Sequence, residues 1–349
     1  MLRPRRFERE VDPGPVQIQA RKVHFDVSDI PLHWIPGHPV ASNVVGLLNV
    51  VLPAAERWFV ATLNEALPLV KDPKLADDVR GFIGQEVTHA DIHEHVLRDF
   101  MVARGIDPKP MLDQVEYVFA HVLAPTTSTA PERRLNHLCD RLWLIAAIEH
   151  YTAVLGDFAL NCAWDDYGAD PTLVDLFRWH GSEEVEHRNV AHDVAVYFHD
   201  SYVDRIRSML MAVVFISTFF QRGAWYLCKA DPELNIGWWK MQRLRMLDSK
   251  KGLLPKYRKL FGSNTLMYSG PVSRPNRWVR RRRPSPIWPV PRRRAQRTFD
   301  ADLRPLPSRA TERLGSLTTR RPHRPCGCGR HRDVGPFRVD PASSPAGPT

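Results

Sequence analysis

Apolar residues recur at helical spacing through most of the first 265 residues, and proline, glycine and Asp-Pro steps interrupt the pattern where helices are expected to begin or end. No run of alternating apolar and polar residues long enough for a strand occurs before residue 260. The sequence therefore predicts an all-α fold, with helices over residues 41–70, 72–104, 107–124, 131–164, 170–199, 204–229 and 232–247.

The same pattern divides the chain into three parts. Prolines interrupt residues 1–40, which are predicted to be irregular, and residues 41–265 are predicted to form a helical domain. Residues 270–349 contain 14 Pro and 19 Arg without hydrophobic periodicity, which predicts a disordered Arg/Pro-rich tail. Two origins are open for this tail: a GC-rich gene read in the wrong frame, which would make the tail frameshift-derived, or a genuine basic segment that binds anionic partners.

The net charge of +10 comes from this tail and not from the helical domain. Of the 49 basic and 39 acidic residues, 19 basic and 5 acidic ones lie in residues 271–349, so the first 270 residues carry 30 basic and 34 acidic residues. A slightly acidic domain gives no reason to expect nucleic acid as its partner.

Cysteines and apolar runs indicate where the protein is located. The five cysteines are odd in number and dispersed, which argues against a disulfide framework and favours a reducing, cytoplasmic compartment. The basic N-terminus is not followed by an apolar segment, so no signal peptide is predicted. The longest apolar run, residues 209–220, is too short to span a bilayer. We expect it to be a buried helix, with contact to a membrane or an apolar substrate as the alternative.

Two of the predicted helices carry the same polar motif among apolar neighbours, a Glu followed three residues later by a His. The motifs are Glu86 with His89, and Glu184 with His187. Residues three apart share one face of a helix, so each motif offers one carboxylate and one imidazole to a common point. Two such motifs on two helices, with one further Glu from each of two more, form the inward-facing ligand set of di-iron and di-manganese four-helix bundles.

Two more glutamates stand where that ligand set requires them. Glu56 lies 30 residues before Glu86, and Glu149 lies 35 residues before Glu184, separations that suit two antiparallel helices with a short connection. Glu149 also follows the apolar run 142–148, where a buried carboxylate must be paired or bound to a cation. The sequence therefore predicts a ferritin-like four-helix bundle with additional C-terminal helices.

Further polar residues accompany these motifs. His180 lies four residues before Glu184 on the same helix face and is predicted to be a seventh metal ligand, while a ligand role for His93 is left open. Glu183 and Glu186 point elsewhere, so we expect them to face solvent or to hold a His ring by accepting its other N–H. The competing interpretation keeps the whole set as surface charges and helix salt bridges.

Four glutamates with one His for each metal predict two iron ions, with manganese or zinc as alternatives. The first functional hypothesis is an enzyme that activates O₂ to oxidise a small apolar or aromatic substrate. Its partners would be that substrate, O₂ and an electron donor, with a homodimer left open. The second hypothesis is a metal-dependent hydrolase that uses a metal-bound hydroxide. The third is a non-catalytic metal-binding bundle.

Five segments resemble a bacterial family described as predicted metal-dependent hydrolases, and the resemblance extends over roughly residues 25–265. The segments are PLHW at 31–34, LPAAERWF at 52–59, FIGQEVTH at 82–89, AIEHYTA at 147–153 and WHGSEEVEH at 179–187. This resemblance implies a metal-dependent enzyme and includes every proposed ligand. The order of His180, Glu184 and His187 is also similar to that of the di-iron arylamine N-oxygenases, which implies an extra imidazole at His180 and an oxygenase role.

Overall fold

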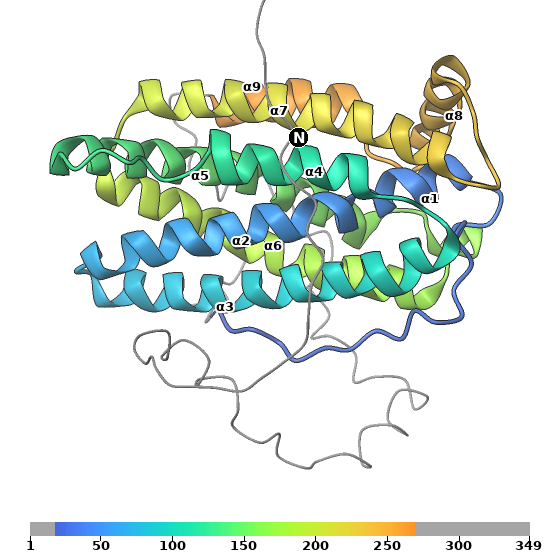
Figure 1. The fold of residues 1–349 in the computed structure, drawn as a ribbon, viewed down its shortest axis with the longest axis horizontal. Coiled ribbons are helices and arrows are strands. Elements are labelled where there is room, and N and C mark those ends of the chain that lie inside the picture. Colours follow the sequence, from blue (N-terminus) through green and yellow to red (C-terminus); the bar gives the residue numbers. More distant parts are fainter. Residues whose placement is uncertain (1–17, 270–349) are drawn as a thin grey trace, which may run out of the picture. The chain divides into compact units, whose positions relative to one another are not determined.

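Four long helices form the centre of the structure, a computed structural model that describes residues 18–269 (Figure 1). They are α2 (Leu48–Ala66), α3 (Pro73–Val96), α5 (Pro131–Asn161) and α6 (Pro171–Phe198). The pair α2 and α3 runs antiparallel through a short connection, and so does the pair α5 and α6. No strand occurs among the described residues, so the all-α prediction is confirmed. The predicted tail lies outside this part of the chain.

Helix ends follow the local sequence signals. Asp72 and Asp170 precede the first prolines of α3 and α6, and each aspartate accepts a backbone N–H of its own first turn, from Leu75 at 2.9 Å and from Thr172 at 2.8 Å. Gly105, with a φ of 86°, ends the helical stretch that continues from α3. These caps set the limits of the helices that carry the polar motifs.

The predicted helix over 41–70 is divided in two, although not at its proline. A short α1 (Pro39–Gly46) precedes α2, and Pro53 lies inside α2 without opening a new helix. A segment of this region, Pro39–Leu69, is long and apolar enough to cross a membrane by length and composition, but 67% of its most apolar window is buried inside the bundle. Burial against other helices therefore accounts for its composition.

The last predicted long helix begins later than the sequence suggests. The prediction placed it over 232–247, whereas α8 spans Trp238–Lys250. The carboxylate of Asp231 accepts the backbone N–H groups of Glu233 and Leu234 at 2.9 and 3.1 Å, and Asn235 adopts a left-handed φ of 33°. Because of this turn, residues 232–237 are not helical, and α8 begins after Gly237.

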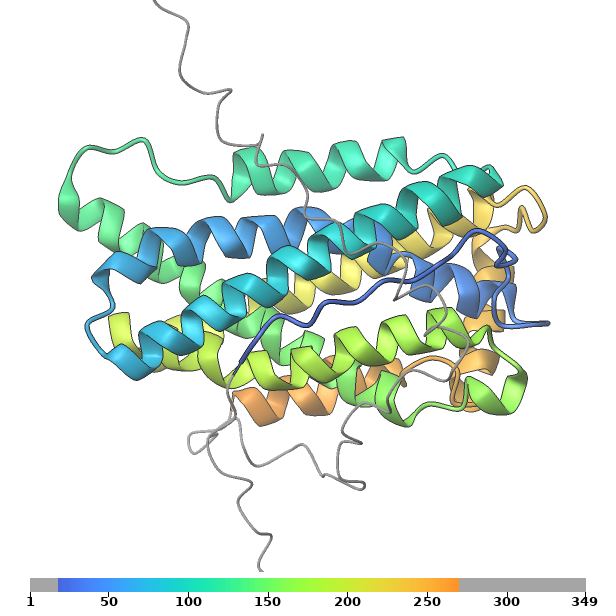
Figure 2. The ribbon, with the colours of Figure 1, turned by 90° about the horizontal axis from the view of Figure 1, so that it is seen from below.

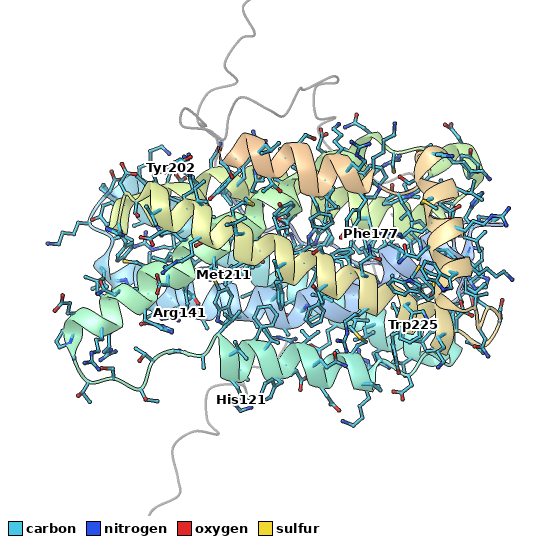
Figure 3. All side chains as sticks on the ribbon, turned by 90° about the horizontal axis from the view of Figure 1, so that it is seen from above. His121, Arg141, Phe177, Tyr202, Met211 and Trp225 are labelled. Carbon is cyan, nitrogen blue, oxygen red and sulfur yellow. The ribbon has the colours of Figure 1, made fainter. Side chains whose placement is uncertain are left out.

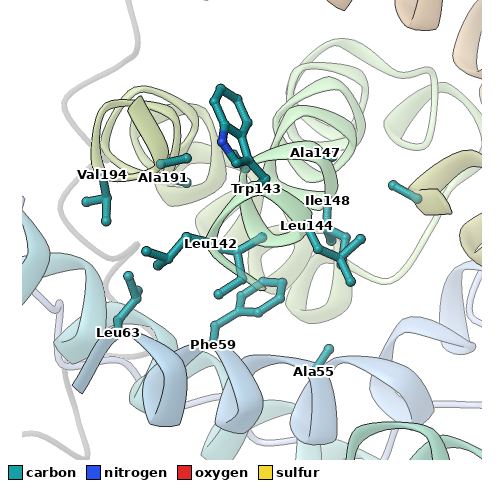
Figure 4. Close-up of a cluster of buried hydrophobic side chains, with 14 of the residues drawn as sticks. Ala55, Phe59, Leu63, Leu142, Trp143, Leu144, Ala147, Ile148, Ala191 and Val194 are labelled. Atoms are coloured by element: carbon teal, nitrogen blue, oxygen red, sulfur yellow. The ribbon is translucent and has the colours of Figure 1, made fainter. Parts of the chain in front are cut away.

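Additional helices cover the central four. Helix α7 (Tyr202–Ala230) packs along α5 and α1, α4 (Lys109–Tyr117) packs on α2, α8 crosses one end of the bundle beside α1, and α9 (Asn264–Tyr268) lies on α7 (Figure 1). Between the central helices, Phe59 and Leu63 of α2 face Leu142 of α5, with Ala191 and Val194 of α6 beside them (Figure 4). This apolar core fixes the spacing of the four helices.

The apolar run 209–220 is buried on one side only. Met209 of α7 is fully buried, whereas Val214 is 66% exposed and Met211, labelled in Figure 3, is 49% exposed. The expectation of a buried helix therefore holds for the face of α7 that meets α5. The outer face leaves apolar side chains in contact with solvent.

Residues 18–36, here called the N-terminal segment, run as an extended chain along α3 and α6 (Figure 2). Its side chain Trp34 is 1% exposed and packs against Trp164 and Phe177. At the other end of the segment, the backbone of Ile18 lies so close to Gly81 of α3 that no Cβ would fit there. The segment therefore covers the face where α3 meets α6.

Candidate metal centre

All seven residues predicted as ligands lie in the interior of the bundle, and each is at most 7% exposed. Seven side chains from four helices converge there: Glu56 from α2, Glu86 and His89 from α3, Glu149 from α5, and His180, Glu184 and His187 from α6. The interpretation of these residues as surface charges is therefore wrong. Their helix faces turn inward because apolar neighbours on the same faces are buried with them.

The ligand atoms form two overlapping groups. Within each group, one nitrogen or oxygen from every residue lies within 4.8 Å of the others. The first group joins Glu56, His89, His180 and Glu184, and the second joins Glu86, His89, Glu184 and His187. The two groups share His89 and Glu184, so these residues could hold two neighbouring cations.

Glu149 stands at the edge of the second group. One of its carboxylate oxygens lies 3.7 Å from Nδ1 of His187 and accepts a hydrogen bond from the Thr152 hydroxyl at 3.2 Å. Its other oxygen is buried without a hydrogen-bond partner among the described residues. The structure thus brings Glu149 to the cluster and leaves one of its oxygens free to bind a cation.

The strongest sign of a cation-binding site is a set of unsatisfied polar atoms. Eight buried atoms of the cluster have no hydrogen-bond partner in the described chain: both oxygens of Glu56 and Glu86, one oxygen each of Glu149 and Glu184, and Nδ1 of His89 and His187. Buried polar atoms without partners are rare, and each costs about 1–3 kcal/mol. Divalent cations would satisfy them together, so the residues present fit a metal centre.

Distances within the cluster agree with this assignment. Nδ1 of His187 lies 2.7 Å from a Glu86 oxygen without the geometry of a hydrogen bond, and Nδ1 of His89 lies 3.5 Å from Glu184. Donors that surround one ion at about 2.0–2.2 Å are separated by roughly 3–4 Å. The distance between His89 and Glu184 is therefore that of two ligands of one ion, and the distance between His187 and Glu86 is slightly shorter.

Hydrogen bonds at the outer nitrogens orient two of the imidazoles. Nε2 of His89 contacts a Glu183 oxygen at 3.0 Å, and Nε2 of His187 contacts the amide oxygen of Gln85 at 2.8 Å. These oxygens only accept hydrogen bonds, so each Nε2 carries a proton, and Nδ1 of each ring faces the cluster, where it can bind a cation when the ring is neutral. The expectation that Glu183 holds a His ring is confirmed.

His180 is oriented by a longer chain of hydrogen bonds. The amide oxygen of Asn49 contacts Nδ1 of His93 at 2.8 Å, and Nε2 of His93 contacts Nδ1 of His180 at 2.8 Å. Since the Asn49 oxygen accepts, His93 donates to it and in turn accepts from His180. Nε2 of His180, 2.9 Å from Glu184, is therefore the nitrogen of this ring that faces the cluster. Both nitrogens of His93 are engaged in these contacts, one with Asn49 and one with His180, so we infer that His93 orients His180 rather than binding a metal.

The electrostatics of the cluster favour the addition of positive charge. Burial and the neighbouring carboxylates raise the pKa values of Glu56 and Glu149 well above the ordinary range. Burial opposes ionisation of Glu184 as well, but the surrounding imidazoles, His180 foremost, outweigh it and lower the pKa of this carboxyl. Four carboxyl groups this close can be ionised together only when positive charge is added.

Three residues of this arrangement escaped the sequence analysis. Arg21 of the N-terminal segment pairs with Glu183 at 2.6 Å and with Glu186 at 2.9 Å, and it reaches α6 across more than 160 residues of sequence. Gln85 and Asn49 were also missed. A polar residue inside the apolar stretch 44–51 was a usable signal for Asn49, whereas nothing local marks Arg21.

Removing the Gln85 amide should weaken metal binding without removing a ligand. In Gln85→Leu, the Nε2–H of His187 loses its acceptor and the ring loses its fixed orientation. Such outer contacts contribute about 10–100-fold to metal affinity. We therefore expect a loss of that size in a competition titration with a chromogenic chelator, with two ions still bound at saturation. Gln114→Leu on the exposed side of α4 is the control, and equal affinities in both variants would contradict this role.

Comparison with known proteins supports a metal-dependent function for this cluster. Residues 19–271 match the model of a family described as predicted metal-dependent hydrolases. No curated protein and no solved structure matched the chain. The matched region covers more than half of the chain and includes all seven buried candidate ligands. The resemblance noted in the sequence is thus confirmed, and the chain belongs to the family of predicted metal-dependent hydrolases.

Proposed function

We propose that the protein is a metal-dependent hydrolase whose two divalent cations are held by Glu56, Glu86, His89, Glu149, His180, Glu184 and His187. The proposal rests on the eight buried, unpartnered ligand atoms of this cluster. The family description favours hydrolysis over the O₂-dependent hypothesis. Two cations in such a site supply an activated water and polarise a carbonyl or phosphoryl oxygen.

The protein contributes orientation and a dry environment. His180 and Glu184 form part of the wall of a cavity of about 460 Å³, and apolar side chains such as Leu52, Leu155 and Phe177 line the same cavity. This volume lies within the range of roughly 300–1,000 Å³ that is common for small-molecule sites. The apolar wall would hold the non-reacting part of a substrate and exclude bulk water from the cluster.

A direct assay tests the proposal. The full chain is stripped with a chelator, reloaded anaerobically with zinc, manganese or iron(II), and assayed with chromogenic esters of increasing acyl length. We expect hydrolysis that requires metal and proceeds without O₂, and Glu184→Gln should reduce it to the rate of the metal-free protein. Glu116→Gln, an exposed carboxylate on α4, should leave the rate unchanged. Absence of hydrolysis with all three metals would contradict the proposal.

Oxidation with O₂ is the second candidate, and one observation favours it. The cluster combines four carboxylates with three imidazoles from four helices of a bundle, which is a carboxylate-rich set of the kind that suits iron. Under this alternative, the anaerobically prepared iron(II) protein should consume O₂ and develop a visible absorption band in air. Zinc-dependent hydrolysis without these changes would exclude it, and metal bound in large excess of two ions per chain would favour storage instead.

A further inference from the structure

The cavity beside the metal centre extends to a basic side chain. Its lining includes His180 and Glu184 of α6, inside the bundle, and also Arg245 of α8, the helix that crosses one end of the bundle (Figure 1). Most of the lining between them is aliphatic or aromatic. A ligand that fills this space would therefore contact the metal centre with one part and α8 with another.

Arg245 lies in this wall without an anionic partner. Its Nε is buried and has no hydrogen-bond partner among the described residues, and no described carboxylate lies within 4.0 Å of its guanidinium. Its guanidinium lies over the ring of Tyr257, whose centroid is 5.1 Å from Cζ. Burial lowers the pKa of Arg245, as expected of a cation that has lost water without gaining a counter-ion. A half-buried guanidinium in this state favours an incoming anion.

The other charges around the cavity have the same sign. Besides Arg245, its lining contains Lys250, Lys256 and Arg258, and the sole acidic residue of the lining is the metal-centre residue Glu184. The three additional basic side chains are exposed, so the potential is positive where the cavity meets solvent. Charge therefore separates along the cavity, with carboxylates at the metal centre and cations beside α8.

We propose that the substrate of this site is an anionic amphiphile, with an apolar chain or ring system along the cavity and a carboxylate or phosphate head group bound by Arg245. The claim that this molecule is a substrate rests on the proposed function. The claim that it binds here does not depend on its being hydrolysed. The reactive group would be the end of the molecule that reaches His180 and Glu184. Guanidinium recognises both head groups in a bidentate manner, so the two head groups are compared by experiment.

The test measures binding by isothermal titration calorimetry to the full chain loaded with zinc. Dodecanoate, dodecyl phosphate and the neutral dodecanol share one chain and differ in the head group. We expect one or both anions to bind at least 10-fold more tightly than the alcohol, and each methylene removed from the better anion to weaken binding roughly fourfold. Arg245→Gln should abolish the preference for the anion, Arg245→Lys should keep part of it, and Arg243→Gln, on the exposed side of α8, should keep all of it.

Several outcomes would overturn the inference. Equal affinity for the anions and the alcohol would show that the site does not recognise an anionic head group. An unchanged preference for the anion in Arg245→Gln would show that the anion binds elsewhere, for example on the metal ions. An affinity that does not change with chain length would show that the apolar chain does not bind in the cavity. Melting curves establish that each variant is folded. Binding that follows Arg245 without any metal-dependent hydrolysis would support this inference and contradict the hydrolase proposal, so the two failures are distinguishable.

Discussion

Glu184→Gln should remove both metal ions, whereas Glu56→Gln should remove only one. The difference follows from the two overlapping groups of ligand atoms, because Glu184 belongs to both and Glu56 to the first alone. Metal analysis of the anaerobically purified full chain should give fewer than one ion for the first variant and about one for the second, against two for the unaltered protein. Glu116→Gln should keep two.

Thermal stability gives an independent measure of the same prediction. An amide at position 184 or 56 removes a buried charge, so neither variant should be less stable than the unaltered protein when all are free of metal. At a free metal concentration about 100 times the Kd, each site adds roughly 2.7 kcal/mol to the free energy of unfolding. This increment should disappear in Glu184→Gln and be about halved in Glu56→Gln. Retention of the full increment in Glu184→Gln would refute the shared position of this carboxylate.

Gly156→Ala should destabilise the bundle and disturb the metal centre together. A Cβ at Gly156 would lie 2.3 Å from the carbonyl oxygen of Gly181, and backbone atoms in the middle of two long helices cannot move aside. Helices α5 and α6 must then separate, at an expected loss of about 1–3 kcal/mol in the free energy of unfolding. Because Glu149 lies two turns before Gly156 on the same face, this separation should also draw it away from His187 and lower the metal affinity.

The matched control is Gly84→Ala on α3. There the new Cβ would meet the Ala20 methyl at an ordinary contact of 3.6 Å, so the gain in helix propensity, up to about 1 kcal/mol, should prevail. Urea denaturation of both variants, with and without metal, separates the two effects. A Gly156→Ala protein as stable as Gly84→Ala would show that the close contact of α5 and α6 is not needed.

Much of the fold follows from local patterns. Prolines at the first turn and apolar periodicity located the beginnings of α3, α5 and α6 to within one residue, because capping and amphipathicity act over a few turns of chain. The same periodicity placed Glu86 and His89 on one face of α3, and the apolar run before Glu149 indicated that this carboxylate of α5 is buried. The error at α8 arose where the side chain of Asp231 replaced helical hydrogen bonds, which periodicity does not register.

Contacts between helices could not be predicted in this way, because they depend on which buried faces meet and on the relative positions of the helices along their axes. Helical spacing suggested His93 and His180 as alternative ligands, but only packing showed that Asn49 and His93 form a chain of contacts to Nδ1 of His180, which turns its Nε2 toward the cluster. Packing likewise placed Arg21 on Glu183, 162 residues away in the sequence. A residue's helix face is encoded within a few neighbours in the chain, whereas its partner is chosen by the three-dimensional arrangement of all the helices. The amino-acid pattern therefore identified the candidate ligands, and the tertiary structure decided how they are grouped, which of their atoms face one another and that an apolar cavity leads from them to Arg245.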